Sequence, residues 1–313
     1  MYFSHGGGDG PVHLVLARPL TATLGALLRA LRPKQWTKNS VMFIGLVFAL
    51  KLGEPALVGL ALAAFAAFCL LSSGVYLIND LVDLERDRQH PVKRQRPLAS
   101  GDLPVGMGMA AAAFLLPVAL GLSFLINWRF GLIALAYLLL NLGYSFALKH
   151  VVILDVFAIG AGFVLRVVGG AVAINVPVSP WLYVCTILGA LFLGLTKRRH
   201  ELLLLEAEAG HHRRILQEYS PQLLDQLTTI VTATLVMAYS LYTFSAENLP
   251  RNHAMMLTIP FVLYGVFRYL YLVHQRSAGG SPEDLLWQDR PLLATCLLWG
   301  VTVVALLYGL PRG

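Results

Sequence analysis

Residues 56–78 read ALVGLALAAFAAFCLLSSGVYLI, and the polar pair Asn79-Asp80 follows directly. This stretch carries no charge and has about the 20 residues that an α-helix needs to cross the hydrocarbon core of a bilayer. Because lipid offers the backbone no hydrogen-bond partner, a segment inside it must bond within itself, as a helix does. The stretch therefore predicts a membrane-spanning helix that ends in polar side chains at one membrane surface.

The same apolar pattern recurs along most of the chain. Further uncharged runs cover residues 105–126, 130–148, 178–196, 226–246 and 291–311. Two more runs, 153–174 and 254–273, contain only one or two charges each, and residues 38–50 form a shorter candidate. None of these runs alternates polar and apolar residues as membrane β-strands do. We therefore expect an all-α, polytopic membrane bundle of about nine transmembrane helices.

The overall composition agrees with a membrane protein and excludes several other classes. Of the 313 residues, 57% are hydrophobic and 13% are charged, against roughly 25% charged residues in soluble domains. A soluble globular protein, a disordered chain and a nucleic-acid-binding domain all need more charged surface. Cys69, Cys185 and Cys296 are isolated in apolar runs and show no metal-binding or disulfide spacing. The partner that composition implies is the lipid bilayer, with no nucleic acid.

The distribution of positive charge predicts the orientation in the membrane. With nine spans, one set of loops holds 19 Lys and Arg residues and the other set holds four. Because basic loops stay in the cytosol, we expect a cytosolic N-terminus and an external C-terminus in a multi-pass protein of the cell (plasma) membrane. Residues 1–19 are expected to be disordered. Residues 20–313 are expected to form one transmembrane domain, with cytosolic active-site loops near 79–102 and 197–221.

The first of these loops begins with a cluster of carboxylates. If the helix continues, its residues are rotated by about 100° each, so Asp80, Asp83 and Asp87 fall within a stripe about 60° wide. Carboxylates this close repel one another unless a cation lies between them, and oxygen ligands of this kind suit Mg²⁺, which also contacts substrate phosphates. Asn79 is placed to orient the cluster or to add a ligand. The alternative is a solvated helix end with local ion pairs.

Each of the two predicted cytosolic loops contains a segment rich in basic residues. We expect them to bind substrate phosphates, because Lys and Arg contact phosphate oxygens directly. Ordinary positive-inside charge, with a Lys197–Glu201 pair at i,i+4, is the alternative. The residues concerned are Lys93, Arg94, Arg96, Lys197, Arg198, Arg199 and Glu201.

Other polar residues lie where helices meet the same surface. Asp155 is near the cytosolic end of its span, whereas Arg166 is three turns deeper on nearly the same face; for Arg166 a structural pair and a substrate contact both remain open. We also expect contacts to phosphates from residues at the start of the first span and the end of the fourth. These are Lys34, Gln35, Lys38, Asn39, Tyr144 and Lys149.

Several of these segments together resemble a known family. The motif Asn79-Asp80-x-x-Asp83-x-x-x-Asp87, the nine-span layout and Arg32-Pro33-x-x-Trp36 at the first span are similar to the UbiA superfamily of intramembrane prenyltransferases. The resemblance covers almost the whole chain. Within that family, residues 32–39, 79–97, 144–149 and 197–201 look most like the decaprenyl-phosphate phosphoribosyltransferase branch.

One departure from the family pattern favours this branch. Ordinary members are expected to carry a second Asp-rich motif after the sixth span, whereas this chain has Thr196-Lys197-Arg198-Arg199-His200-Glu201 there. The resemblance implies transfer of a 5-phosphoribosyl group from phosphoribosyl diphosphate (PRPP) to a polyprenyl phosphate of the decaprenyl type. It further implies release of diphosphate, dependence on Mg²⁺ held by Asp80, Asp83 and Asp87, and a role in making cell-wall arabinan precursors for arabinogalactan.

Two other functions stay open on the sequence alone. One is a prenyltransferase that moves an isoprenyl chain from its diphosphate to an aromatic or other acceptor. The other is a transporter of a phosphorylated solute, for which inverted repeats and helices broken at the midplane would be expected. A homo-oligomer is compatible with both the phosphoribosyltransferase and the prenyltransferase.

Overall fold

The fold is a bundle of long helices, seen in a computed structural model that describes residues 20–207, 218–246, 249, 252–276, 280 and 282–309. Eight helices in this part are long and apolar enough to cross a membrane, and it contains no strand. They are α3 (Pro55–Val82), α5 (Val105–Ile126), α6 (Trp128–Phe146), α7 (Leu154–Ala173), α8 (Pro180–Ala207), α9 (Pro221–Ser245), α10 (Ile259–Gln275) and α12 (Arg290–Gly309). The predicted all-α membrane bundle and its eight longer spans are confirmed.

The shorter ninth candidate folds differently from the other eight. It consists of a 3-10 helix, η1 (Pro33–Phe43), followed by the short α-helix α2 (Ile44–Phe48). A 3-10 helix rises about 2.0 Å per residue and an α-helix about 1.5 Å, so the two pieces together are about 30 Å long. This length matches the hydrocarbon core even though the segment is too short to span it as an α-helix alone.

The 3-10 geometry also sorts the side chains of η1. With three residues per turn, residues at i and i+3 lie above one another. Trp36, Asn39 and Met42 share one face, where Asn39 and Met42 are buried and Trp36 donates a hydrogen bond to Ser73 of α3. Lys38 lies on another face and lines the central cavity.

Close packing between η1 and α7 depends on Gly170. A Cβ atom built at this position would lie 2.1 Å from the carbonyl oxygen of Met42, a distance that no side chain tolerates. The glycine therefore brings the backbone of η1 directly against α7 and fixes the position of the polar residues of η1.

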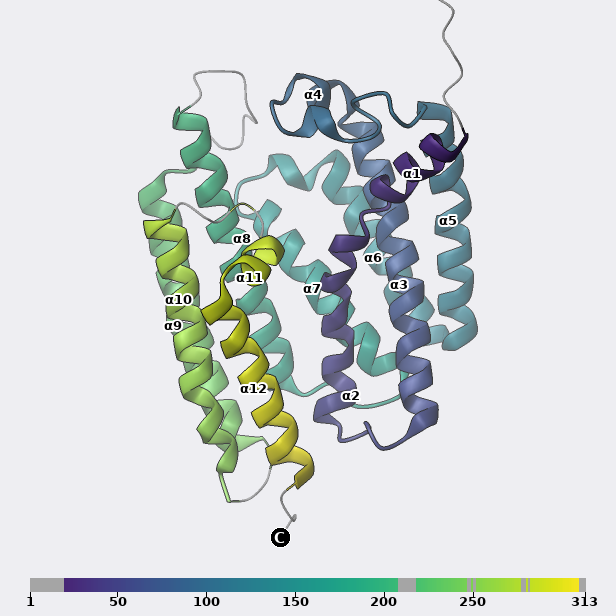
Figure 1. Ribbon diagram of the computed structural model, residues 1–313. Coiled ribbons are helices and arrows are strands. Elements are labelled where there is room, and N and C mark those ends of the chain that lie inside the picture. Colours follow the sequence, from purple (N-terminus) through teal and green to yellow (C-terminus); the bar gives the residue numbers. More distant parts are fainter. Residues whose placement is uncertain are drawn as a thin grey trace, which may run out of the picture.

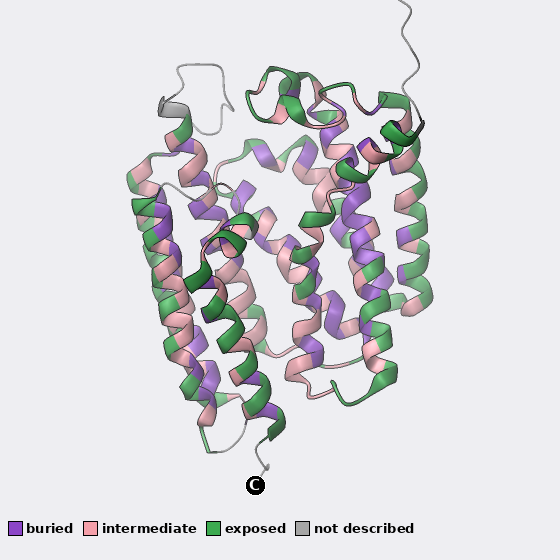
Figure 2. Cartoon of the chain, in the orientation of Figure 1, coloured by how far each residue is buried: buried purple, intermediate pink, exposed green. Residues whose placement is uncertain are grey.

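Figure 2 shows which helices lie inside the bundle and which lie outside it. More than half of the apolar window of α7 is buried, compared with 17% for α5. Leu125 of α5 and Val301 of α12 are 84% and 67% exposed. Such outward-facing apolar residues are expected where the solvent is lipid.

Short helices precede or connect the spans. They are α1 (Leu20–Ala30), α4 (Leu84–Gln89), η2 (Lys93–Gln95), η3 (Leu148–His150), η5 (Ala254–Thr258) and α11 (Pro282–Gln288). In Figure 1, α1 and α4 lie at the same end of the bundle, and α12 runs to the opposite end. Residues 1–19, expected to be disordered, lie outside the described residues, as do residues 208–217 of the second predicted loop.

Candidate active site

A cavity of about 860 Å³ lies between the two halves of the bundle. Its walls come from η1, α3, α6, α7 and α8, with α10, α11 and α12 on the remaining side. Seven Lys or Arg side chains and one acidic side chain, Glu201, belong to its described lining. The cations are Arg32, Lys38, Lys93, Arg96, Arg166, Lys197 and Arg198. The cavity therefore favours anionic ligands.

The acidic residues at the end of α3 lie behind this positive wall. Asp80 is buried and accepts hydrogen bonds from Arg32 at 2.5 Å and from Arg96 at 3.0 Å. The same Nη1 atom of Arg96 donates to Asp87 at 2.6 Å. One guanidinium therefore bridges two carboxylates, which are drawn together as the sequence predicted.

Asp83 has a different partner because the helix is interrupted there. α3 ends at Val82 and α4 begins at Leu84, with Asp83 between them outside the regular helical geometry. Lys149 of η3 donates to its Oδ1 atom at 2.7 Å, and both side chains are nearly fully buried. The carboxylates thus occupy one region, but Asp83 belongs to a separate ion pair from Asp80 and Asp87.

The carboxylates have the chemistry that Mg²⁺ prefers, and two of them already share one positively charged group. Mg²⁺ prefers oxygen ligands and often binds through one or two carboxylates together with substrate phosphates. In the described part of the chain no three His, Cys, Asp or Glu side chains form a ready-made metal site. Asp80 and Asp87 nevertheless both reach one positively charged group, Arg96, so the pair fits a cation between them once Arg96 turns to a phosphate.

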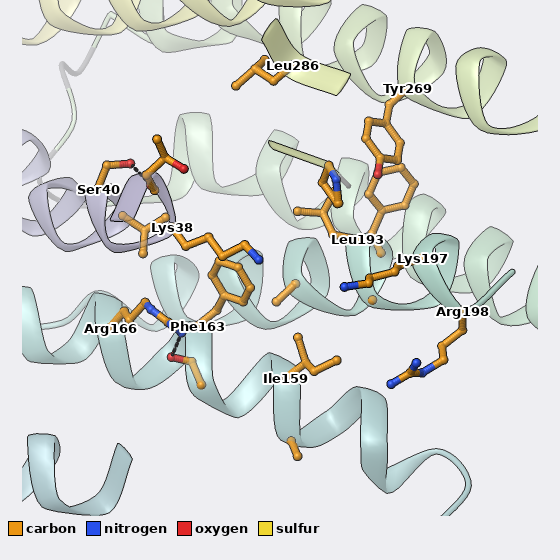
Figure 3. A pocket seen from close by; sticks show the side chains of 18 of the residues that line it. Lys38, Ser40, Ile159, Phe163, Arg166, Leu193, Lys197, Arg198, Tyr269 and Leu286 are labelled. Atoms are coloured by element: carbon orange, nitrogen blue, oxygen red, sulfur yellow. Dashed lines mark hydrogen bonds between the residues drawn. The ribbon is translucent and has the colours of Figure 1, made fainter. Parts of the chain in front are cut away.

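The end of α8 carries cations that face in different directions. Figure 3 shows Lys197 pointing into the cavity from α8, opposite Lys38 from η1, while Arg198 points away from them. Arg198 donates from Nε to Asp155 at 2.5 Å and also bonds Glu201 and Tyr144. Arg198 therefore joins Tyr144 and Asp155, two other residues that the sequence singled out, in one hydrogen-bonded group.

Tyr219 completes the surroundings of Asp155. Its hydroxyl donates to Asp155 Oδ1 at 2.7 Å and accepts a hydrogen bond from the backbone N–H of Ile153. Burial, together with the bond to Asp155, raises the pKa of Tyr219 above its usual value. The phenol thus stays protonated and holds Asp155, which in turn positions Arg198.

The predicted phosphate-binding residues divide into three groups by position. Those on the cavity wall are Lys38, Lys93, Arg96, Tyr144, Lys197, Arg198 and Glu201, and Asn79 lies there too. Asn39 and Asp155 lie directly behind it, where they contact the wall residues Arg166 and Arg198, whereas Lys149 bonds Asp83 outside the wall. Lys34, Gln35, Arg94 and Arg199 are not among the described residues of the wall, and Arg199 instead bonds Asp225 of α9 at 2.6 Å.

Sequence reasoning missed several residues that build this site. Arg32 entered only as part of a motif, yet it contacts Asp80 and stacks over Tyr76 with its guanidinium 5.0 Å from the ring centre. Tyr219 and Asp225 gave no signal at all, because each acts on a residue of another helix. The one usable signal was the position of Arg32 directly before the polar start of the first span.

Comparison with known proteins agrees with this architecture. The profile described as the UbiA prenyltransferase family matches residues 40–285. The chain is 34% identical over 295 residues to the decaprenyl-phosphate phosphoribosyltransferase of Corynebacterium glutamicum, covering 91% of this chain and 87% of that protein. It is 33% identical over 307 residues to the protein of that name from Mycolicibacterium smegmatis, covering 93% and 95%.

A solved structure shares the fold at lower sequence identity. A UbiA homolog from Archaeoglobus fulgidus, bound to GPP and Mg²⁺, aligns with a TM-score of 0.68 at 19% identity over 90% of this chain and 99% of that one. At this identity the likeness establishes the common arrangement of helices.

Proposed function

The chain belongs to the UbiA prenyltransferase family and is an integral membrane transferase, and from this premise we propose that it transfers the 5-phosphoribosyl group of PRPP to a polyprenyl phosphate. The observation that carries this proposal is the positive wall of the cavity, with Lys197 and Arg198 where a second acidic motif is expected in ordinary members. Three anionic moieties, namely the diphosphate, the 5-phosphate and the lipid phosphate, require such a wall. The names of the relatives support the same substrates.

In this reaction the bond between C1 of ribose and the diphosphate oxygen breaks. The diphosphate leaves with the electron pair, and an oxygen of the lipid phosphate forms the new bond to C1. A phosphate monoester has its second pKa near 6, so at neutral pH it is already an anion and needs no strong general base. The protein's task is therefore to bring several anions together and to stabilise the charge of the leaving group.

The residues at the end of α3 suit the leaving diphosphate. Asp80 and Asp87 would hold Mg²⁺, which supplies positive charge for the departing oxygens when it is bound, while Asp83 stays in its ion pair with Lys149. Arg32 and Arg96 now bond these carboxylates, and their guanidinium groups also line the cavity. These two side chains can therefore exchange a carboxylate for a phosphate in the cavity by rotating in place.

The other side of the cavity suits the lipid. Leu286, Leu292 and Trp299 of α11 and α12 belong to its apolar lining, and a polyprenyl tail can lie there between helices. The positive-inside distribution supports a cytosolic active site and N-terminus in the cell membrane. The resemblance supports a role for the product as a lipid-linked pentose for cell-wall arabinan.

Incubation of the purified protein with labelled PRPP, decaprenyl phosphate and Mg²⁺ tests the proposal. We expect label in the lipid fraction and release of one diphosphate for each labelled lipid. A parallel reaction offers geranyl diphosphate with an aromatic acceptor in place of PRPP. Product from that reaction, without labelled lipid in the first, would contradict the proposal and favour a true prenyltransferase.

A further inference from the structure

Arg166 of α7 is a buried arginine whose hydrogen-bond partners in the described part of the chain are all neutral. It is 6% exposed. Its Nε atom donates to Asn39 at 2.7 Å, Nη1 to the carbonyl oxygen of Gly162 at 3.0 Å, and Nη2 to the Tyr137 hydroxyl at 2.7 Å. These bonds fix the direction of the guanidinium, but none of the described residues that it bonds supplies a counter-charge.

Three other arginines on the helices around the cavity each have a carboxylate partner. Arg198 bonds Asp155, Arg199 bonds Asp225, and Arg268 bonds Asp289. Arg166 is also deep, since it follows Asp155 by 11 residues on one helix, which is about 17 Å along the axis. A charge at such depth is costly and usually faces a partner or a functional cavity.

Arg166 does face the cavity, and a second cation lies close to it. Both Arg166 and Lys38 line the cavity. Figure 3 shows Lys38 reaching over the ring of Phe163, with Arg166 beside that ring, and the guanidinium lies 5.3 Å from the ring centre. Lys38 and Asn39 are neighbours in η1, so the bond from Arg166 to Asn39 joins Arg166 to the short helix that carries Lys38.

We propose that Arg166 and Lys38 form an inner phosphate site that binds a phosphate monoester. A forked guanidinium next to an ammonium group suits the oxygens of a terminal phosphate. The aromatic and aliphatic surroundings raise the strength of this interaction by excluding water. The bound phosphate supplies the counter-charge that Arg166 lacks.

This inference rests on the proposed function, which brings two phosphate monoesters into the cavity. One is the lipid phosphate and the other is the 5-phosphate of PRPP. The apolar walls from α10 and α12, including Val262 and Leu292, favour the lipid phosphate, whose tail they would surround.

Calorimetric titration of the full-length protein in detergent separates these sources. The probes are farnesyl phosphate, ribose 5-phosphate and, as the uncharged reference, farnesol. We expect Arg166→Gln to bind farnesyl phosphate at least tenfold more weakly, about 1.4 kcal/mol, with unchanged binding of farnesol. A selective loss of ribose 5-phosphate binding would also support the site and would assign it to the sugar phosphate.

Two controls guard against damage to the fold. Arg129→Gln changes an exposed arginine at the start of α6, away from the cavity lining, and should bind all probes as the wild type does. Lys38→Gln tests the same site without disturbing the buried hydrogen bonds of Arg166, and should weaken the same monoester severalfold.

Unchanged binding of both monoesters in Arg166→Gln and Lys38→Gln would overturn the inner site, as would an equal loss of farnesol binding. The proposed function has a separate test: it is refuted if the wild type forms no labelled lipid from labelled PRPP. A wild type that binds farnesyl phosphate through Arg166 but forms no labelled lipid would refute the reaction and retain the site.

Discussion

The C-terminal end of α3 and the C-terminal part of α8 both carry clustered charges. The carboxylates in the two clusters have different roles. At the end of α3, Asp80 and Asp87 share Arg96, a cation that also lines the cavity. At the end of α8, Asp155 is fully buried behind Arg198 and is held by Tyr219. In the first arrangement the carboxylates can exchange Arg96 for a metal ion, whereas in the second the carboxylate fixes Arg198 in the cavity wall. Similar residues thus serve as candidate metal ligands at one end and as supports at the other.

The largest effect is expected from breaking the buried pair Asp83–Lys149. Asp83→Asn leaves the Lys149 ammonium buried without a carboxylate, which costs about 3–5 kcal/mol of unfolding free energy in comparable pairs. Chemical denaturation in detergent measures this loss. The double variant Asp83→Leu/Lys149→Met removes both charges and should recover most of the stability. A single variant as stable as the wild type would contradict the buried pair.

Asp80→Asn should affect the reaction more than the fold. Arg32 and Arg96 are about a quarter exposed, so they are not stranded when the carboxylate is lost. We expect transfer from PRPP to fall by at least about 100-fold, the scale of one lost electrostatic contribution to a transition state, with a small change in melting temperature.

Glu85→Gln is the matched control for Asp80→Asn. Glu85 lies in the same loop but forms an exposed pair with Arg88, which contributes little to stability. Its activity should equal that of the wild type. Equal activity in Asp80→Asn and Glu85→Gln would show that Asp80 holds no group needed for the reaction.

Two neighbouring cations at the end of α8 sharpen the comparison. Lys197 points into the cavity, whereas Arg199 bonds Asp225 outside the described wall. We expect Lys197→Gln to lower kcat/KM for PRPP by about 10- to 100-fold, the value of one or two charge-assisted contacts, and Arg199→Gln to lower it by less than about threefold. Steady-state assays in nanodiscs measure both, and the reverse order would show that Arg199, not Lys197, binds the phosphates.

The smallest effect is expected from Tyr219→Phe. The variant loses the donor to Asp155 while keeping the ring, at a cost of about 1 kcal/mol. Arg198 should then be held less firmly, and kcat should fall a few-fold with little change in the KM for PRPP. Because burial raises the pKa of Tyr219, the wild-type phenol stays neutral and the two proteins should share one alkaline limb in their pH profiles. A shift of that limb in the variant would mean that Tyr219 itself titrates in the reaction.

The sequence predicted the features that lipid and helix periodicity control. The eight long spans follow from their apolar length. The spacing predicted that Asp80 and Asp87 lie close together, and they do so through Arg96 although the helix is interrupted at Asp83 between them. The first span was only a candidate, because its apolar run is too short to cross the bilayer as an α-helix; the structure makes up part of the length with a 3-10 helix. Hydropathy alone does not reveal that this geometry turns Lys38 to the cavity and Asn39 to the core.

Pairs between distant helices were beyond reach of the sequence. Arg199 looked like a neighbour of Arg198 with the same role, yet one helical step turns it toward Asp225. Arg166 was conspicuous as a charge in a span, but its neutral partners Asn39 and Tyr137 come from η1 and α6. Such contacts depend on how the helices pack, and the charges and spacing within one helix do not determine that packing.

A structure of the protein with PRPP and Mg²⁺ bound tests the positive wall most directly. We expect the phosphates of PRPP inside the cavity, with Lys197 and Arg96 among their contacts and Asp80 on the metal. Phosphates bound outside the cavity, or held without contact to its Lys and Arg side chains, would contradict this function.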